Sequence, residues 1–282
     1  MTKSLIKHAI ALGALLLSPQ TLADTQWRTV SPEKLMVMTL PHGQVVFELA
    51  PQFAPNHVKH FAELASKGHY DNNTFYRVID GFVAQVGPGQ SEEASAKEKT
   101  LAIESEWTLD SSAITSIQSN DLFAEQTGFI DGFAVASDSK DNKAWLTHCP
   151  GVVAMARGNE PDSATSHFYI TNGQAPRYLD RIMTVFGRVV YGMDNVQAIK
   201  RTSVIEGDKP VDAKDYTPIL SMQLMSSLPK AEQFVIQIED TNSKAFKDKI
   251  VDRRARPHAF FYKKPPPVLD VCQVPVRSKV IR

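Results

Sequence analysis

The stretch that decides the fold is Phe75-Tyr-Arg-Val-Ile-Asp-Gly-Phe-Val-Ala-Gln-Val-Gly87. Two short β-rich runs flank the turn dipeptide Asp80-Gly81, and this pattern predicts a tight hairpin. Alternation along an extended segment predicts that Phe75, Arg77 and Ile79 share one face. A guanidinium inside an apolar run costs free energy unless it has a function or a carboxylate partner. Arg77 is therefore the first candidate for a functional residue.

Further motifs follow in the second half of the chain. They are Gly151-Val-Val-Ala-Met-Ala-Arg157, Asp162-Ser-Ala-Thr-Ser-His-Phe-Tyr-Ile170, Tyr178-Leu-Asp180 and Val185-Phe-Gly-Arg-Val-Val-Tyr-Gly-Met193. With the Arg77 stretch, and in this order, they resemble the motifs of the cyclophilins, the peptidyl-prolyl cis-trans isomerases. The resemblance runs from about Leu35 to about Leu224, with one long insertion.

The resemblance implies a mostly β fold: a closed antiparallel barrel of eight strands with an α-helix over each open end. It places a cyclophilin-like domain at residues 33–226, an insertion at about 88–149 and a C-terminal extension at 227–282, which we expect to pack on the domain. Strands are predicted at Leu35–Leu40 and Val45–Leu49 by the apolar runs around a Pro-His-Gly turn.

Two helices are predicted to cap the barrel. Pro55 suits a first helical turn, apolar residues recur at helical spacing after it, and Gly68 suits the end. We expect the histidines of this helix, His57 and His60, to be solvated. The second helix is predicted over 192–200.

The N-terminus bears on the compartment of the protein, and the overall charge bears on its possible partners. Lysine residues precede a short apolar run and the small-residue site Thr21-Leu-Ala23, so residues 1–23 read as a signal peptide, and a membrane anchor is the weaker alternative. We expect export to the periplasm with no membrane insertion after signal removal. Equal totals of 31 basic and 31 acidic residues give no general case for binding nucleic acid. We expect a monomer.

The chain has two cysteines, Cys149 and Cys272. In an exported protein they are candidates for a disulfide, and two unpaired buried thiols are the alternative. His148-Cys149 lacks further ligands at a recognisable spacing, so no metal site is predicted, and no cofactor is expected.

The insertion and the extension differ in charge. Residues 91–146 carry eleven acidic side chains and four lysines, and residues 230–282 carry twelve basic and six acidic side chains. We expect the insertion to be a solvated excursion, part of which packs on the barrel through Phe129, Ile130 and Phe133; a partner-binding flap is the alternative. In the extension, 234–238 is predicted as a strand and 241–256 as a charged helix with Ala245, Phe246, Ile250 and Val251 on one side. The basic tail is expected to lie on the acidic insertion.

Prolyl isomerisation needs no nucleophile. The barrier of about 18–20 kcal/mol reflects lost amide resonance, and an enzyme lowers it by stabilising the twisted amide more than the planar one. The prolyl nitrogen gains a lone pair at the twist, to which a fixed, permanently charged guanidinium can donate a hydrogen bond. The resemblance gives this role to Arg77.

The resemblance also implies a substrate site for proline-containing unfolded or partly folded polypeptides. Its positions are Phe82, Val83, Gln85, Ala156, Arg157, His167, Tyr169, Tyr178, Leu179 and Met183. Phe168, out of phase with its neighbour, is expected in the core. Four of these positions depart from the family's usual residues: His167 replaces Gln, Val83 replaces Met, Tyr169 replaces Phe and Met183 replaces His or Tyr. These changes predict an altered rate or sequence preference.

Two other functions compete with an isomerase that folds exported proteins. A proline-peptide binding module or chaperone with little turnover would keep the groove, and the insertion and tail favour it. A serine hydrolase built from Asp162, Ser163 and His167 is a poor alternative, because these residues lie too close together in the sequence.

Overall fold

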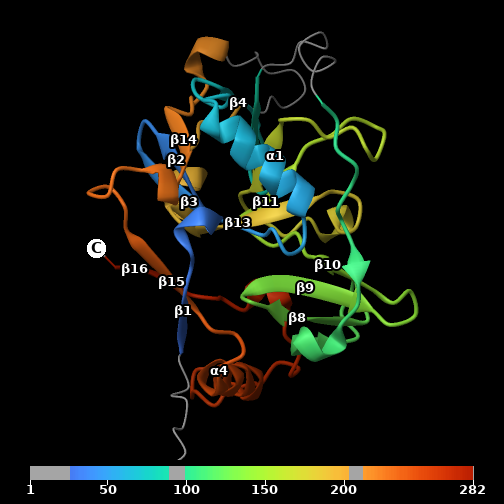
Figure 1. The fold of residues 1–282 in the computed structure, drawn as a ribbon. Helices are drawn as coiled ribbons and strands as arrows, with labels where there is room; N and C mark the ends of the chain where they lie inside the picture. Colours follow the sequence, from blue (N-terminus) through green and yellow to red (C-terminus); the bar gives the residue numbers. More distant parts are fainter. Residues whose placement is uncertain (1–25, 89–98, 203–211, 282) are drawn as a thin grey trace, which may run out of the picture.

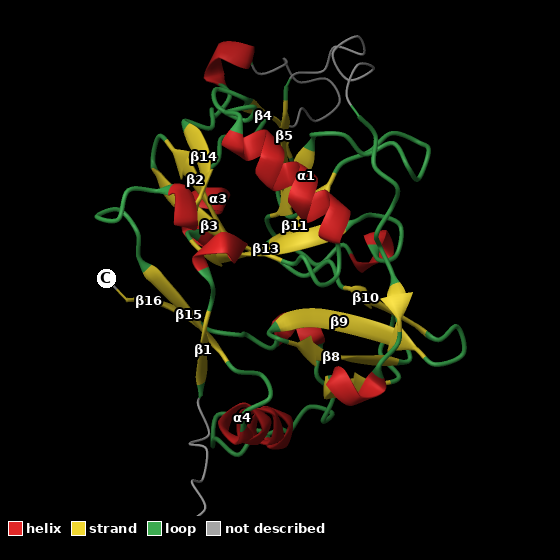
Figure 2. Cartoon of the chain, in the orientation of Figure 1, coloured by secondary structure: helices red, strands yellow, loops and turns green. Residues whose placement is uncertain are grey.

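The computed structural model describes residues 26–88, 99–202 and 212–281. The predicted signal peptide lies outside them, as does part of the insertion. Strands dominate the described chain (Figure 2). The strands are β1 Trp27–Thr29, β2 Leu35–Leu40, β3 Gly43–Leu49, β4 Thr74–Val78, β5 Val83–Gly87, β6 Trp107–Thr108, β7 Thr115–Ser119, β8 Gln126–Ile130, β9 Phe133–Asp138, β10 Lys143–Leu146, β11 Val152–Met155, β12 Phe168–Thr171, β13 Val185–Tyr191, β14 Ser221–Leu224, β15 Val235–Glu239 and β16 Ser278–Ile281. The α-helices are α1 Pro55–Ser66, α3 Met193–Gln197 and α4 Lys244–Ala255, and the 3-10 helices are η1 Pro32–Lys34, η2 Ser111–Ala113, η3 Arg177–Leu179, η4 Ala213–Asp215, η5 Met225–Ser227 and η6 Val271–Gln273.

The largest sheet has eight antiparallel strands in the order β14-β2-β3-β13-β11-β12-β5-β4. It is strongly curled, and its two end strands approach each other at an isolated bridge between Thr74 and Pro218 and at a hydrogen bond from Phe75 N to Thr217 O of 3.0 Å. Two more hydrogen bonds, from Asn72 N to Ile219 O and from Ile219 N to Asn73 O at 2.8 Å, join the same segments, but β4 and β14 do not pair as strands. The mostly β, eight-stranded prediction is confirmed, whereas full closure of the barrel is not.

The Arg77 stretch forms the predicted hairpin, with one change. Gly81 takes the left-handed conformation (φ +69°) that the turn requires, and the N–H of Ile79 donates to Val83 O at 2.9 Å. A β-bulge between Phe75 and Arg77 shifts the register against β5. Phe75 is fully buried while Arg77 is half-buried, so the prediction of a shared face is wrong. The extra residue of a bulge turns the following side chain to a different direction.

Helix α1 covers the large sheet and begins at the predicted proline (Figure 1). Val58, Phe61 and Ala65 face the core, where the Phe61 ring meets Phe168 edge-on at 5.2 Å. The predicted second helix is shorter than expected, because α3 covers only Met193–Gln197. Its Val196 is buried in the same core.

The start of α1 corrects the prediction for its histidines. His57 is fully buried, and its ring nitrogen Nδ1 lies 2.7 Å from Oε2 of Glu104 in the insertion. His60 is half-buried. No side chain of the helix's own N-cap residue accepts a bond. Glu104 instead accepts the backbone N–H groups of Asn56 at 3.1 Å and His57 at 3.0 Å. A distant carboxylate thus supplies the cap that the local sequence lacks.

The insertion is a folded unit, and the expectation of a solvated excursion is wrong for its described part. Its strands form a five-stranded antiparallel sheet in the order β6-β10-β9-β8-β7. Phe129 and Phe133 are buried against the large sheet and the tail, as predicted. The weak periodicity of the segment reflects short strands separated by turns.

The C-terminal extension lies against both sheets (Figure 1). Strand β15 pairs with β1 and β16 in a third antiparallel sheet, and Phe246 of α4 meets Phe129 edge-on at 5.6 Å. Cys149 and Cys272 form a disulfide with an S–S distance of 2.04 Å. Val251 is 63% exposed and Phe246 is buried, so the prediction that the two share one side of α4 is wrong.

Apolar and main-chain contacts join the basic tail to the acidic insertion. Leu269 N donates to Gln118 Oε1 at 3.1 Å, and the Arg254 guanidinium donates to Ile117 O. Lys249 and Arg277 pair with Glu239 of the tail itself. The expected contact between tail and insertion therefore exists, and these two cations are neutralised within the tail.

Candidate active site

The Arg77 hairpin presents a cation beside an aromatic ring. The guanidinium carbon of Arg77 lies 5.5 Å from the centre of the Phe82 ring, and Nη1 donates to Gln85 Oε1 at 3.3 Å. The nearest acid in the sequence, Asp80, pairs with Arg201 at 2.6 Å instead. Within the described residues no carboxylate pairs with Arg77, so its charge is not neutralised by a neighbour.

A line of hydrogen bonds runs from Arg77 across the strands. Gln85 Nε2 donates to the Tyr76 hydroxyl at 2.6 Å, and that hydroxyl lies 2.9 Å from Nδ1 of His167. Burial raises the pKa of Tyr76, while the bond from Gln85 acts against this shift. The phenol therefore stays protonated and can donate to His167.

His167 has room only because residue 87 is glycine. A Cβ atom at Gly87 would lie 2.2 Å from Nδ1 of His167, closer than any real contact. The imidazole at position 167 therefore requires a glycine at position 87 on the neighbouring strand. The carbonyl of His167 also accepts the backbone N–H of Ala156 at 2.9 Å, which fixes the edge of β12 against the segment after β11.

The apolar positions differ in their exposure. Val83 and Tyr169 are buried in one cluster, and Phe82, Ala156 and Met183 pack against it half-buried. Tyr178 is 65% exposed, and its ring stacks on Phe82 with the centroids 6.4 Å apart. Leu179 is half-buried in η3. Phe168 is fully buried in the core of the large sheet, as predicted.

Arg157 is held by main-chain carbonyls. Its Nε and Nη2 donate to Ile182 O at 3.0 and 2.9 Å, and Nη1 donates to Gly158 O and Asn159 O. The guanidinium thus fastens the segment after β11 to the loop before β13. Arg157 is therefore not a freely solvated side chain.

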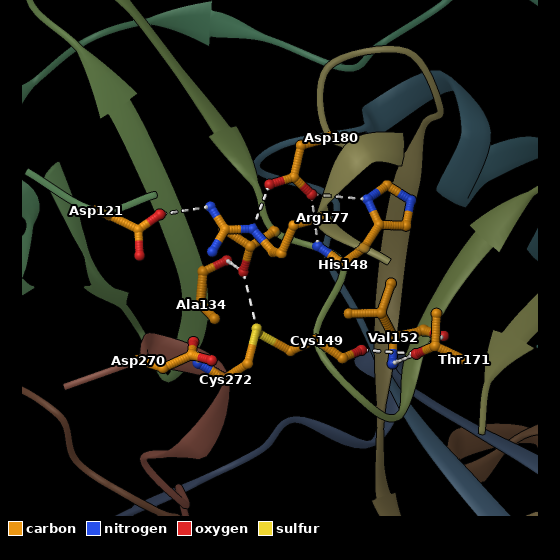
Figure 3. Close-up of a disulfide and its surroundings, with 11 residues drawn as sticks. Asp121, Ala134, His148, Cys149, Val152, Thr171, Arg177, Asp180, Asp270 and Cys272 are labelled. Carbon is orange, nitrogen blue, oxygen red and sulfur yellow. Dashed lines mark hydrogen bonds and ion pairs between the residues drawn. A yellow bond between two sulfur atoms is a disulfide. The ribbon is translucent and has the colours of Figure 1, made fainter. Parts of the chain in front are cut away.

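Sequence reasoning missed a buried polar chain behind Tyr169. The Tyr169 hydroxyl lies 2.9 Å from Nε2 of His148. On the other side of the same ring, Nδ1 of His148 lies 3.0 Å from Oδ1 of Asp180 (Figure 3). A carboxylate only accepts, so in the neutral imidazole Nδ1 donates to Asp180 and Nε2 accepts from Tyr169. Burial raises the pKa of Tyr169, and the charge of Asp180 raises it further.

The same chain continues to the insertion. Asp180 Oδ2 accepts from Nε of Arg177 at 2.5 Å, and Arg177 Nη2 lies 3.3 Å from Oδ1 of Asp121 (Figure 3). The sequence contained one signal for this arrangement. A tyrosine in place of phenylalanine at a buried position needs a partner for its hydroxyl, and His148 supplies it.

Two further findings concern ligands and membranes. In the described ranges no group of three or more His, Cys, Asp or Glu side chains could hold a metal ion. In the same ranges no helix is long and apolar enough to cross a bilayer.

Comparison with known proteins agrees with the fold. The family model described as "Cyclophilin type peptidyl-prolyl cis-trans isomerase/CLD" matches residues 35–224. A protein of Brucella suis named "Probable peptidyl-prolyl cis-trans isomerase" is 32% identical over 208 residues, which cover 72% of this chain and 89% of the relative. A peptidyl-prolyl cis-trans isomerase of Acinetobacter baylyi is 31% identical over 196 residues, covering 68% and 80%.

Among the similar solved structures, one matches this chain over most of the length of both chains. The crystal structure of cyclophilin AquaCyp293 from Hirschia baltica has a TM-score of 0.72 and 27% identity, and the match covers 90% of this chain and 93% of that one. The family model covers less of this chain, so the similarity extends beyond residues 35–224. The curled eight-stranded sheet is that of a cyclophilin-type protein. The chain belongs to the cyclophilin-type peptidyl-prolyl cis-trans isomerase family and is an isomerase.

Proposed function

We propose that the protein catalyses rotation about X-Pro bonds through Arg77. The observation that carries this proposal is the geometry of the guanidinium, which lies beside the Phe82 ring with no carboxylate partner in the described chain. A charge in this state can donate to the prolyl nitrogen when the amide is half-turned, and that interaction is absent when the amide is planar.

The other predicted positions bind the chain around the proline. Phe82, Val83, Tyr169, Leu179 and Met183 form the apolar pocket for the pyrrolidine ring, while Gln85 and His167 supply polar contacts at its edge. Tyr178 and Ala156 extend the groove on either side. Arg157 acts by holding the loop before β13, because its donors are already used by main-chain carbonyls.

The natural substrates in this proposal are proline-containing polypeptides in the periplasm. The pattern of residues 1–23 supports export. A disulfide between the chain's two cysteines fits an oxidising compartment.

A protease-coupled assay on a short Ala-Pro peptide tests the proposal. Arg77→Ala should lower kcat/KM by about one to three orders of magnitude, and Arg77→Lys should lie between, because it keeps the charge and loses the planar fork. Arg253→Ala on α4 is the matched control and should leave turnover unchanged. If wild type and Arg77→Ala both match the uncatalysed rate while peptide still binds, the protein is a proline-binding module and the catalytic proposal is wrong.

A further inference from the structure

The turn between β7 and β8 brings two large apolar side chains close to the proposed substrate groove. Leu122 is 88% exposed and Phe123 is 49% exposed. Exposed apolar side chains that occur together mark interaction surfaces more often than single ones. We call this pair, together with Asp121, the insertion tip.

The insertion tip is fastened to the element that carries the groove residues. Asp121 pairs with Arg177 at 3.3 Å, and the Phe123 ring lies over the same guanidinium, 5.2 Å from its carbon. Arg177 is buried and is the first residue of η3, which also carries Tyr178 and Leu179. The next residue along, Tyr178, stacks on Phe82. The tip is therefore linked, through Arg177 and the adjacent Tyr178, to the Phe82 ring that lies beside Arg77.

A hollow adjoins the insertion tip. Its volume is about 580 Å³, and Leu122, Phe123 and Ala175 line one side, with Val268 and Leu269 of the tail on another. Val268 is also exposed. Cys272 lines the hollow as well, so the disulfide to Cys149 holds the tail wall in place. The walls come from three separate parts of the chain: the insertion, the segment around η3 and the tail.

We infer that the insertion tip and this hollow form an additional subsite for the same substrate chain, which takes an apolar side chain several residues from the proline. The occupant is an extended, unfolded polypeptide, because Arg177, which lines the hollow, is followed in η3 by Tyr178, which stacks on Phe82 of the proposed groove. This inference rests on the proposed function for the identity of the groove. The subsite would favour unfolded chains that carry leucine or similar residues near the proline over polar ones.

The test compares two peptides of about fifteen residues, long enough to span about 50 Å when extended. Both contain one Ala-Pro bond. At positions several residues before and after that bond, one peptide carries leucine and the other carries serine, and the rest of the two sequences is identical. Fluorescence anisotropy gives Kd for each peptide with wild type and with Leu122→Ser/Phe123→Ser. Val251→Ser, which removes an exposed apolar side chain from α4, is the matched control. Circular dichroism melting checks that each variant is folded.

Wild type should bind the leucine peptide at least about fivefold more tightly, which corresponds to about 1 kcal/mol, as expected for partial burial of one or two apolar side chains. The tip variant should reduce this preference to about twofold or less, and Val251→Ser should retain it. A preference that survives in the tip variant, or that falls equally in Val251→Ser, overturns the inference.

The outcome is separable from the proposed catalysis, because Kd does not depend on turnover. If wild type fails to isomerise the Ala-Pro bond but the tip variant loses the leucine preference, the catalytic proposal is wrong and the subsite is supported. If isomerisation is normal and the preference is unchanged in the variant, the subsite is wrong and the catalytic proposal remains.

Discussion

At the scale of single residues, the Gln85 amide decides what Arg77 contacts. Its Nε2 donates to Tyr76 and its Oε1 accepts from Arg77. A Tyr76 hydroxyl that donates to His167 is left to accept from Nε2, and it thus supports the amide orientation that the donor-only guanidinium requires. The opposite orientation would place an N–H group against the guanidinium. Tyr76 is thus a positioning residue, which acts on Arg77 through Gln85.

Tyr76→Phe tests this arrangement. The ring stays and the hydroxyl is lost, so Gln85 Nε2 and His167 each lose a partner in a half-buried place, at a cost of about 1–3 kcal/mol. We expect a fall in kcat/KM for an Ala-Pro peptide of about three- to tenfold, carried mainly by kcat. Tyr191→Phe, at a half-exposed position on β13, should change neither rate nor stability. Equal losses in both variants would contradict the role of Tyr76.

Single residues also show how much of the site could be predicted. Arg77 was singled out from the hairpin pattern, whose turn and short strands are visible in the sequence, and the resemblance to the cyclophilins then implied roles for Phe82 and Gln85 in the same hairpin. The partner of Tyr169 was not, since His148 and Asp180 come from other segments, and only the fold brings them together. His167 could be named, but its dependence on Gly87 requires the spacing between two strands.

At the scale of elements, the carboxylate of Glu104 joins the insertion to α1. Burial alone would raise the pKa of Glu104, but the hydrogen bonds from the His57 ring and from the backbone of His57 and Asn56 together lower it. A carboxyl group with a lowered pKa in the folded state stabilises the fold above its ordinary pKa of 4.5. That contribution is lost as the pH falls through the folded-state value.

Glu104→Gln should therefore lower the free energy of unfolding by about 1–2 kcal/mol near neutral pH. The difference from wild type should shrink as the pH falls below about 4.5, because the wild-type carboxyl then becomes protonated too. Urea unfolding at several pH values measures both effects. Glu63→Gln, an exposed change on the same helix, is the control; a constant difference at all pH values would show that the charge of Glu104 does not matter.

Burial of His57 makes the stability depend on pH over a higher range, in wild type and in Glu104→Gln. Desolvation lowers the pKa of His57 below its ordinary 6.5, while the Glu104 carboxylate opposes this shift. The unfolded state then binds more protons than the folded state below about pH 6.5. Stability should therefore begin to fall at that pH, before the loss from Glu104 sets in.

The disulfide links elements that are 123 residues apart in the sequence. The chain-entropy model assigns about 4–5 kcal/mol to a bridge that closes a loop of this length. We expect Cys149→Ser/Cys272→Ser to lower the free energy of unfolding by up to this amount, measured by urea unfolding against wild type without reductant. Wild type in reductant should resemble the variant. A variant as stable as oxidised wild type would contradict the proposed contribution.

Elements were predictable where their signals are local. The strands β2 and β3 and the start of α1 follow from apolar patterns and a helix-starting proline. The insertion sheet was not predicted, because its two- to six-residue strands show little periodicity of their own. The cap on α1 was missed for a different reason, since Glu104 is 47 residues from His57 in the sequence.

At the scale of the whole molecule, the three sheets share buried apolar residues. One cluster draws on the large sheet, the insertion sheet and the tail; its members include Val83, Val152, Tyr169, Val185, Phe129, Val135, Leu146, Phe246, Ile250, Leu269 and Val274. A buried charge network adds to it, because Glu48 of β3 pairs with Arg188 of β13 at 2.9 Å and with Arg28 of β1 at 2.5 Å. The insertion and the extension therefore belong to the same folding unit as the large sheet.

This shared core predicts a single unfolding transition. The three tryptophans, Trp27, Trp107 and Trp145, lie in β1, β6 and β10, outside the large sheet. Their fluorescence should change at the same denaturant concentration as hydrogen exchange of the amides in β3 and β13, measured by mass spectrometry. Two separate transitions would show that the insertion and the extension unfold independently of the large sheet.

The central claim is that Arg77 stabilises the half-turned prolyl amide more than the planar one. Exchange NMR on an Ala-Pro peptide measures the cis–trans rate and the binding of the same peptide in one sample. We predict that wild type exchanges the peptide much faster than the uncatalysed reaction, which takes about tens of seconds. Arg77→Ala should lose at least about tenfold more in the exchange rate than in affinity for the peptide. Equal losses of rate and affinity, or an unchanged rate in Arg77→Ala, would contradict the claim.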